Sequence, residues 1–339
     1  MQVATRLREE DDMDGVLPGL NEIESAARLI YQTMPPTPQY SWPLINARAG
    51  AEVWVKHENH TQVGAFKVRG GLVYMDWLRR ERPEVKTVVS ATRGNHGQSL
   101  AFAAAQYGIR VVLVVPFGNS VEKNRAMRAL GAELVEFGED FQAASEHAER
   151  LERENGWHRA PNFDLRLVTG VATYALELLT ACGALETIYV PIGMGSGACG
   201  MIAARNALGL ATKVVGVVSS HAPAYALSFA AGEVREHESR TAIADGVACR
   251  KPDAVALGIL RAGMNRVVTV DDDEVKEAMR AYFVDTHNVA EGAGAVGLAG
   301  LLKDRANGGP RVGSVLTGGN VDSEVFGEVL CGSRVGALA

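Results

Sequence analysis

Residues 86–116, KTVVSATRGNHGQSLAFAAAQYGIRVVLVVP, decide the fold class. Two short β-branched runs, 86–91 and 111–116, enclose an alanine-rich helical stretch, 98–107, which Gly108 ends. Parallel strands need a crossover of this kind, so the pattern predicts one βαβ unit. The same alternation continues along most of the chain, and it predicts an α/β protein with mostly parallel sheets.

The alternation has one interruption, which divides the chain. A second unit is expected as helix 119–130, strand 132–137 and helix 140–155, before an irregular stretch at 156–164 where we place a domain boundary. Further elements are expected as a strand from 187, a helix at 198–208, and strands at 213–219, 266–270 and 312–316. The continuous apolar runs indicate strands that are covered on both faces. The expected fold is doubly wound in two lobes, with a cleft at the carboxyl ends of strands.

Composition narrows the class of protein and the class of partner. The 339 residues are 47% hydrophobic and 22% charged, which is typical of a globular chain and not of a disordered or coiled-coil one. The 34 basic residues are outnumbered by 40 acidic ones, so nucleic acid is not an expected partner. The start of the chain is acidic and mixed, and no run of 18 apolar residues occurs, so we expect a cytoplasmic protein without a membrane partner. The scattered Cys182, Cys199, Cys249 and Cys331 are expected as small, buried, reduced residues.

A glycine-rich loop follows the strand that begins at residue 187. It reads Gly193-Met194-Gly195-Ser196-Gly197-Ala198-Cys199-Gly200, and it directly precedes a helix. Free backbone amides and a helix amino terminus converge there, which predicts an anion site. Gly195–Gly200 also matches G-x-G-x-x-G, but the next strand ends without the acid that a dinucleotide ribose needs. We therefore favour a phosphate monoester over a dinucleotide, while tight helix packing alone remains the structural alternative.

Two other segments carry candidate chemistry. Lys67 lies between Phe66 and Val68 in a run of small residues, where loss of water would lower its pKa and leave an amine able to form a Schiff base. A lysine with a solvated head group is the common alternative. The turn at 90–98 joins a buried strand to a helix, and its polar side chains can bind a carboxylate or simply cap the helix.

Taken together, the motifs resemble the fold-type II pyridoxal-phosphate enzymes, specifically the threonine/serine dehydratase and serine racemase family, over about residues 35–325. The matching segments, in order, are Thr37-Pro38, Lys56-His57-Glu58-Asn59, Gly64–Gly70, Gly94-Asn95-His96-Gly97-Gln98, Gly193–Gly197, Ile243-Ala244-Asp245-Gly246, Glu291–Ala295 and Thr317-Gly318-Gly319-Asn320. The resemblance implies a two-lobed α/β architecture in which each lobe is an open, mostly parallel sheet flanked by helices. It implies a discontinuous large domain of residues 1–69 and 161–339 that binds the cofactor, and a small domain of residues 70–160.

The resemblance also implies a role for each matching residue. Lys67 would hold pyridoxal 5'-phosphate as a Schiff base, with Phe66 near the ring and Asn95 on the ring oxygen. Thr317 would face the pyridine nitrogen, and Gly246 and Glu291 would line the pocket. The phosphate would be bound by Gly193, Met194, Gly195, Ser196 and Gly197, and the substrate carboxylate would lie near Thr92, Gly94 and His96.

Three departures from the family pattern bear on activity. Ala65 stands where the family usually has serine, and Ser196 offers a compensating hydroxyl. Arg93 occupies the position of the racemase serine, and an arginine is a poor base, which disfavours racemisation by that route. Arg93 could instead bind a second substrate carboxylate or pair with a carboxylate of the protein, and we favour the pairing. The divalent-cation site of some members is not carried over, because the sequence after Gly216 lacks its glutamate.

The expected activity is that of a carbon–oxygen lyase. It would convert a small β-hydroxy amino acid, threonine or serine by default, to a 2-oxo acid and ammonia by α,β-elimination. The alternatives on the same scaffold are a 3-hydroxyaspartate-type dehydratase and an amino-acid racemase. More remote alternatives are a dinucleotide-binding oxidoreductase and a non-catalytic sensor, neither of which would need Lys67. The resemblance further implies a homodimer.

Overall fold

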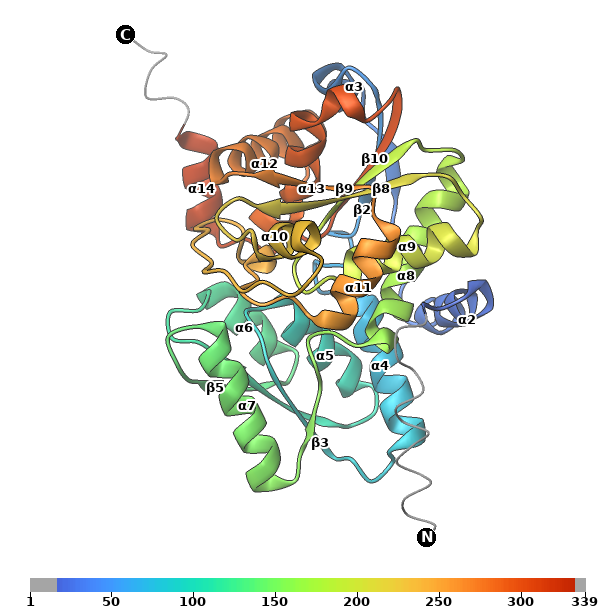
Figure 1. The fold of residues 1–339 in the computed structure, drawn as a ribbon. Coiled ribbons are helices and arrows are strands. Elements are labelled where there is room, and N and C mark those ends of the chain that lie inside the picture. The colour runs from blue at the N-terminus through green and yellow to red at the C-terminus, as the bar shows by residue number, and fades with distance from the viewer. Residues whose placement is uncertain (1–16, 333–339) are drawn as a thin grey trace.

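The computed structural model describes residues 17–332, so the predictions for the start of the chain lie outside the described residues. It contains two sheets, and Figure 1 shows them one above the other. The six-stranded sheet has the order β1 (Gln39–Ser41), β2 (Glu52–His57), β10 (Arg311–Leu316), β7 (Thr187–Pro191), β8 (Lys213–Ser219) and β9 (Arg266–Val270). Only β1 is antiparallel to its neighbour.

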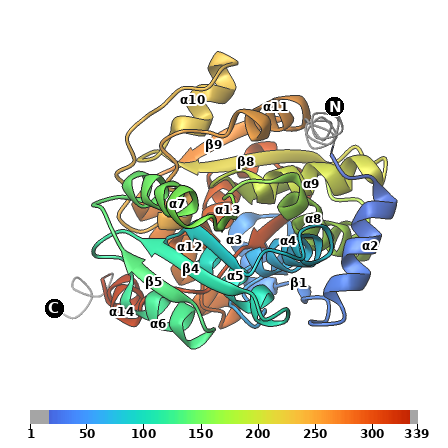
Figure 2. The same ribbon diagram turned by 90° about the horizontal axis from the view of Figure 1, so that it is seen from below.

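The second sheet has four parallel strands, and all of them come from one stretch of the chain. Their order is β5 (Glu133–Glu136), β4 (Arg110–Val115), β3 (Thr87–Ala91) and β6 (His158–Arg159). Figure 2, the view from below, shows this sheet in front with α6 and α7 beside it. The short strand β6 lies in the stretch expected to be irregular. The two sheets agree with a two-lobed α/β fold, and the proposed domain limits at 69/70 and 160/161 stay a prediction.

Helices cover both faces of each sheet, as the apolar runs predict. They are α2 (Leu20–Ile30), α3 (Pro43–Ala49), α4 (Lys67–Glu81), α5 (Asn95–Ala105), α6 (Val121–Ala129), α7 (Phe141–Asn155), α8 (Leu165–Cys182), α9 (Ser196–Ala207), α10 (Ala224–Ala231), α11 (Ala254–Gly263), α12 (Asp272–Thr286), α13 (Gly292–Lys303) and α14 (Ser323–Cys331), with short 3₁₀ turns η1 (Asp245–Val247) and η2 (Arg305–Asn307).

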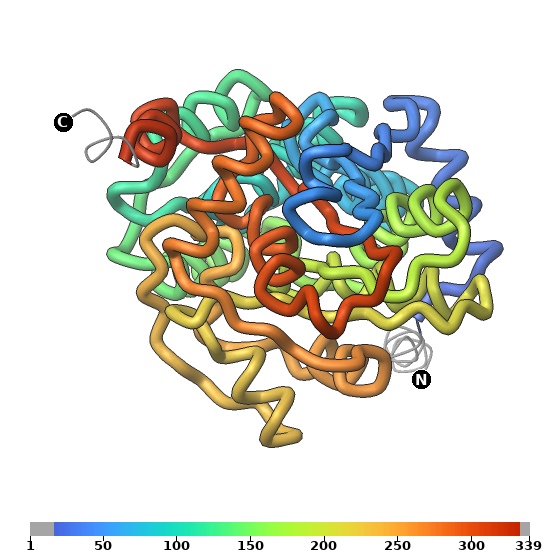
Figure 3. The backbone as a smooth tube through the Cα atoms, turned by 90° about the horizontal axis from the view of Figure 1, so that it is seen from above, coloured from blue at the N-terminus to red at the C-terminus, as the bar shows by residue number. Residues whose placement is uncertain are grey.

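Side chains alternate along the large sheet and so bury two cores. Ile188 and Val190 pack with α8 and α9, whereas Tyr189 between them packs with α12 and α13. This is the period-2 pattern of a strand covered on both sides. In Figure 3 the red C-terminal segment runs beside the blue N-terminal one, because β10 inserts between β2 and β7. This insertion brings the two ends of the predicted motif series together.

The structure tests the expectation that the cysteines are buried. Cys182, Cys199 and Cys249 are buried as expected, but Cys331 at the end of α14 is exposed, so that part of the prediction is wrong.

Helix α8 is 18 residues long with a mean hydropathy of 1.3, which would suffice to cross a membrane. Two-thirds of it is buried inside the protein, where it packs against α4 and α9. Its apolar character is therefore accounted for by the core.

Candidate active site

The segment that carries Lys67 is fixed by a segment 250 residues away. The Phe66 amide donates to the Thr317 carbonyl at 3.0 Å, and the Gly319 amide donates to the Gly64 carbonyl at 2.9 Å. Helix α4 begins at Lys67, so the side chain leaves the chain where a loop becomes a helix. Two motifs quoted separately in the sequence thus form one wall of a site.

Lys67 has the properties of a nucleophilic amine. Burial lowers its pKa to about 8, although the Glu291 carboxylate opposes that shift. Its Nζ lies 4.8 Å from the centroid of the Phe66 ring. Within residues 17–332 the structure gives this nitrogen no hydrogen-bond acceptor and no ion pair, and the side chain keeps some exposed surface. A desolvated, unpaired amine of this kind can attack a carbonyl carbon.

Two positions of the glycine loop between β7 and α9 disfavour any side chain, Gly193 by close contact and Gly195 by its backbone angle. A Cβ at Gly193 would lie 2.4 Å from the Gly246 carbonyl oxygen, and Gly195 has a φ of +99°. A Cβ at Gly197 would lie 3.7 Å from two ring carbons of Phe66. The Phe66 ring therefore lies beside both the glycine loop and the amine of Lys67.

Two buried tyrosines set the orientation of the loop. Tyr225 donates its hydroxyl to the Met194 carbonyl at 3.0 Å, and Tyr174 donates to the Gly197 carbonyl at 2.8 Å. For the amides of residues 193 to 195 the structure gives no acceptor among the described residues. The first turn of α9, which starts at Ser196, leaves its own amides without helical partners. The carbonyls of Met194 and Gly197 are thus bound by the tyrosines, and the amides of the loop remain available to an anion.

The turn after β3 combines a cap with an unpaired base. Thr92 Oγ1 accepts from the amides of Gly94 at 2.9 Å and Gly97 at 3.0 Å, so its oxygen caps α5 and its hydroxyl hydrogen stays available. His96 is buried and its Nε2 has no partner. Burial, together with the charge of Lys67, lowers the pKa of His96 to about 3. A neutral histidine and a helix amino terminus face the amine, an arrangement suited to a carboxylate.

Arg93 differs from the other unpaired arginines of the described residues, which are exposed. It is half-buried, and within residues 17–332 the structure gives it no hydrogen bond and no ion pair. The carboxylate partner that we favoured from the sequence is therefore not among the described residues. Its guanidinium is the unpaired cation of the turn that carries Thr92 and His96.

Glu291 lies at the centre of the remaining contacts. Asn95 donates Nδ2 to Glu291 Oε1 at 2.5 Å, and Thr317 Oγ1 lies 3.3 Å from the Ala293 carbonyl. Burial raises the pKa of Glu291, while Lys123 and Asn95 lower it. A Cβ at Gly246 would lie 2.7 Å from the Ala293 side chain, so the glycine permits close packing against α13. The sequence-predicted residues of this wall thus come together.

Sequence reasoning missed several residues that hold the site. Lys123 pairs with Asp245 and Glu291, and the tyrosines tie down the glycine loop. Asp245 lies inside a matched motif, which is a signal that could have drawn attention to it. Lys123, Tyr174 and Tyr225 stand in no local pattern, since only the folded chain places them here.

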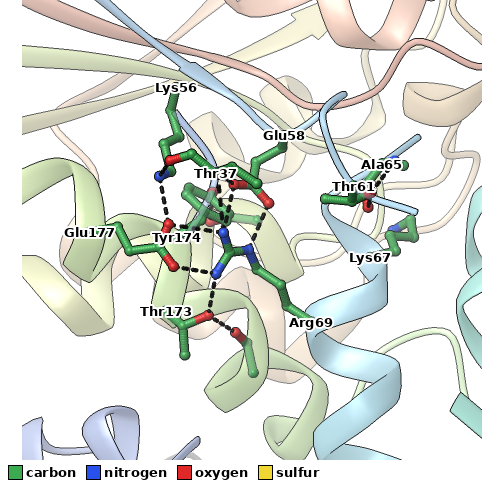
Figure 4. A network of polar contacts seen from close by, with 12 residues as sticks. Thr37, Lys56, Glu58, Thr61, Ala65, Lys67, Arg69, Thr173, Tyr174 and Glu177 are labelled. Atoms are coloured by element: carbon green, nitrogen blue, oxygen red, sulfur yellow. Dashed lines mark hydrogen bonds and ion pairs between the residues drawn. The ribbon is translucent and has the colours of Figure 1, made fainter. Parts of the chain in front are cut away.

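A buried charge network lies beside the first turn of α4. Arg69 donates to Glu58 at 2.7 Å and to Glu177 at 2.6 Å, and Lys56 donates to Glu177 at 2.5 Å. In Figure 4 the guanidinium of Arg69 lies on the opposite side of the helix from Lys67. Two cations and two anions balance each other, as buried charges must. The network anchors the helix turn that presents the amine.

The comparisons with known proteins agree with this geometry. The profile of a family described as pyridoxal-phosphate dependent enzyme matches residues 30–318. An L-threonine ammonia-lyase of Thermotoga maritima is 30% identical over 92% of this chain and 78% of its own. An L-threo-3-hydroxyaspartate ammonia-lyase of Saccharomyces cerevisiae is 28% identical over 95% of this chain and 99% of its own. A solved pyridoxal 5'-phosphate-dependent aspartate racemase superposes with a TM-score of 0.85 at 28% identity, covering 91% of this chain and 97% of that one. The chain belongs to the pyridoxal-phosphate dependent enzyme family.

Proposed function

We propose that this protein is a pyridoxal-phosphate-dependent ammonia-lyase that converts a β-hydroxy amino acid to a 2-oxo acid and ammonia. The observation that carries the proposal is the unpaired, desolvated amine of Lys67 beside a loop of free amides. Relatives with this activity support it. Threonine and serine are the default substrates. The descriptions of the family and of these relatives mention no dinucleotide cofactor.

The residues present fit the cofactor. Lys67 would bind its aldehyde, and the amides of residues 193–197 would bind its phosphate, a role suited to a loop with no room for side chains at Gly193. Phe66 would lie beside the ring, and Asn95 and Thr317 would face the ring oxygen and the ring nitrogen. When bound, the cofactor supplies an electron sink for the bond that breaks next to the amino group.

The chain's own groups supply binding and proton transfer. His96, Thr92 and the amino terminus of α5 would hold the substrate carboxylate. A lysine with a pKa of about 8 is well matched to remove the α-proton at its Nζ near neutral pH. An arginine side chain is a poor base, so Arg93 is not suited to be the second base that racemisation requires. Elimination is therefore favoured over racemisation. The substrate hydroxyl would leave as water, and a water molecule would later replace the amino group, which leaves as ammonia.

A second candidate substrate is favoured by one observation. Arg93 is half-buried and unpaired on the turn that would hold the substrate. An arginine that lacks a carboxylate in the protein can bind one on the ligand through two parallel hydrogen bonds. The names of two related proteins contain acidic amino acids, 3-hydroxyaspartate in one and aspartate in the other. We therefore propose 3-hydroxyaspartate as the alternative to threonine and serine.

One assay decides between these substrates. The protein, supplied with pyridoxal phosphate, is given threonine, serine and each 3-hydroxyaspartate isomer, and the release of 2-oxo acid and ammonia is measured. The two products should appear in equal amounts. Arg93→Ala should reduce turnover of 3-hydroxyaspartate selectively, whereas Arg110→Ala, a surface control, should change nothing. No product from any hydroxy amino acid, or an inverted amino acid as the main product, would reject the ammonia-lyase proposal.

Assembly and location are proposed on family grounds. We infer a cytoplasmic homodimer that binds neither membrane nor nucleic acid. The excess of acidic residues supports the absence of nucleic acid. Sedimentation of the purified protein should give twice the mass of one chain, and a single-chain mass would reject the dimer.

A further inference from the structure

Lys123 is a buried ammonium for which the proposed reaction has no task. It lies in the first turn of α6, next to the small sheet, and its Nζ donates to Asp245 at 2.8 Å and pairs with Glu291 at 3.2 Å. Both carboxylates come from segments of the large sheet's side. Burial lowers the pKa of Lys123, but Glu291 and Asp245 outweigh that effect and keep the pKa above its usual value. Lys123 therefore remains charged at the centre of the protein.

Glu291 links this cation to the amide that would bind the cofactor's ring oxygen. Its Oε1 accepts from Asn95 Nδ2, while its other oxygen faces Lys123. Glu291 Oε2 lies 3.2 Å from Lys123 Nζ in an ion pair, and it has no hydrogen-bond partner among the described residues. Burial raises the pKa of Glu291 above its ordinary value, and the Lys123 ammonium 3.2 Å away opposes that rise, so the ion pair favours the carboxylate form that accepts from Asn95.

A backbone carbonyl fixes the orientation of the Asn320 amide, which in turn fixes the orientation of the Asn95 amide. The Val63 carbonyl can only accept, and Asn320 donates Nδ2 to it at 2.8 Å. The same Nδ2 donates to Asn95 Oδ1 at 2.8 Å. Because Oδ1 is committed to Asn320, Nδ2 must face Glu291, and its second hydrogen has no acceptor among the described residues.

Gly318 allows these groups to meet. A Cβ there would lie 2.5 Å from Glu291 Oε1 and 3.3 Å from Asn95 Nδ2. A glycine is thus required by the close approach, not by its backbone angles. An ion pair and a hydrogen bond thus connect the buried Lys123 ammonium, through Glu291, to the Asn95 amide, whose second hydrogen has no acceptor among the described residues.

We propose that Lys123, Glu291 and Asn320 form a relay that orients the Asn95 amide with a free hydrogen toward the ring oxygen of the cofactor. The inference rests on the proposed function, since it takes Asn95 as the ligand of that oxygen. In this scheme Lys123 is a positioning residue, because it acts through Glu291 and touches no reacting atom.

A lobe-joining role is the alternative for Lys123, and the structure offers a control for it. Other contacts also join α6 to the large sheet's side: Ser120 donates to Asp322, and Glu122 accepts from Ser323. If Lys123 only joined the lobes, Glu122→Gln and Ser120→Ala should resemble Lys123→Met.

The main test uses the visible spectrum of the protein loaded with pyridoxal phosphate. The absorbance of the bound cofactor depends on the protonation of its ring oxygen, so a lost or reversed amide should change it. We expect Lys123→Met and Asn320→Asp to change the band pattern and to weaken cofactor binding on the order of tenfold or more. Glu122→Gln and Ser120→Ala should keep the wild-type spectrum. A wild-type spectrum in Lys123→Met, or the same change in Glu122→Gln, would overturn the relay.

A second test needs no cofactor and separates this inference from the proposed function. Denaturant midpoints are measured for the apo forms of Lys123→Met, Glu291→Gln and the double variant. A buried carboxylate without its cation is costly, so most of the loss in Lys123→Met should be recovered in the double variant. Additive losses would overturn the relay, even if the wild-type protein failed to bind pyridoxal phosphate. Should Lys123→Met not fold, Asn320→Asp gives the spectral result from the other end.

Discussion

The molecule buries charged groups in two neighbouring regions and treats them in opposite ways. Around Arg69, every cation meets a carboxylate, and hydroxyls such as that of Thr173 take the remaining donors. Around Lys67, the amine has no acceptor among the described residues, and the nearby His96 Nε2 likewise has no partner there. Both regions flank the first turn of α4. On this contrast we base the proposal that the paired group serves stability and the unpaired group serves a ligand.

The largest effect should come from breaking the satisfied region. Arg69→Met would leave Glu58 and Glu177 facing each other without their shared cation. Loss of one member of a buried ion network costs about 3–5 kcal/mol of unfolding free energy. Chemical denaturation of the apo protein measures it. A loss below 1 kcal/mol would show that the network is not an anchor.

Gly318→Ala should act on the unsatisfied region without touching the network. The added methyl group would lie 2.5 Å from Glu291 Oε1 and displace it from Asn95. We expect cofactor affinity to fall on the order of tenfold, which corresponds to about 1.4 kcal/mol. Gly258→Ala is the matched control, because nothing lies within 4 Å of a Cβ there. Equal affinities in the two variants would contradict the packing argument.

Lys67→Met should change stability in the opposite direction to Arg69→Met. The pKa of Lys67 is about 8 in the folded protein against its ordinary value of 10.5. The unfolded chain therefore binds more protons between those pH values, and apo stability rises with pH through that window. The variant lacks this rise and should be more stable near pH 7, by about 1 kcal/mol after allowance for solvent screening. Unfolding curves from pH 7 to 10.5 would show a destabilised variant if the amine were in fact paired.

The smallest effect is expected from an exposed ion pair, which sets the baseline for the network. Arg110 and Glu133 pair at the surface between β4 and β5. Exposed pairs contribute about 0–1 kcal/mol, so Glu133→Gln should barely move the denaturation midpoint. A cost as large as that of Arg69→Met would mean that burial is not what distinguishes the network.

The same contrast explains how far the sequence could lead. Strands 213–219 and 266–270 were predicted at their observed limits, because their apolar runs are local signals. Lys67 and the loop at 193–197 were likewise readable from neighbouring residues. The two-residue strand β6 was missed, since so short a strand leaves no periodicity.

Partners that are distant in the sequence were not predictable. Arg69 and Glu177 are 108 residues apart, and Lys123 and Glu291 are 168 apart, so no window of sequence contains either pair. Arg93 shows the converse. Its burial predicted a partner in the protein, yet the fold leaves it unpaired within the described residues. In this site, what the sequence could not reveal is whether a buried charge has a partner.

The most direct test of the account is to find which lysine holds the cofactor. The protein is loaded with pyridoxal phosphate, reduced with borohydride and digested, and the labelled peptide is identified by mass spectrometry. The account predicts a label on Lys67, the unpaired amine, and none on the ion-paired Lys56 or Lys123. A label on either paired lysine, or no label at all, would contradict it.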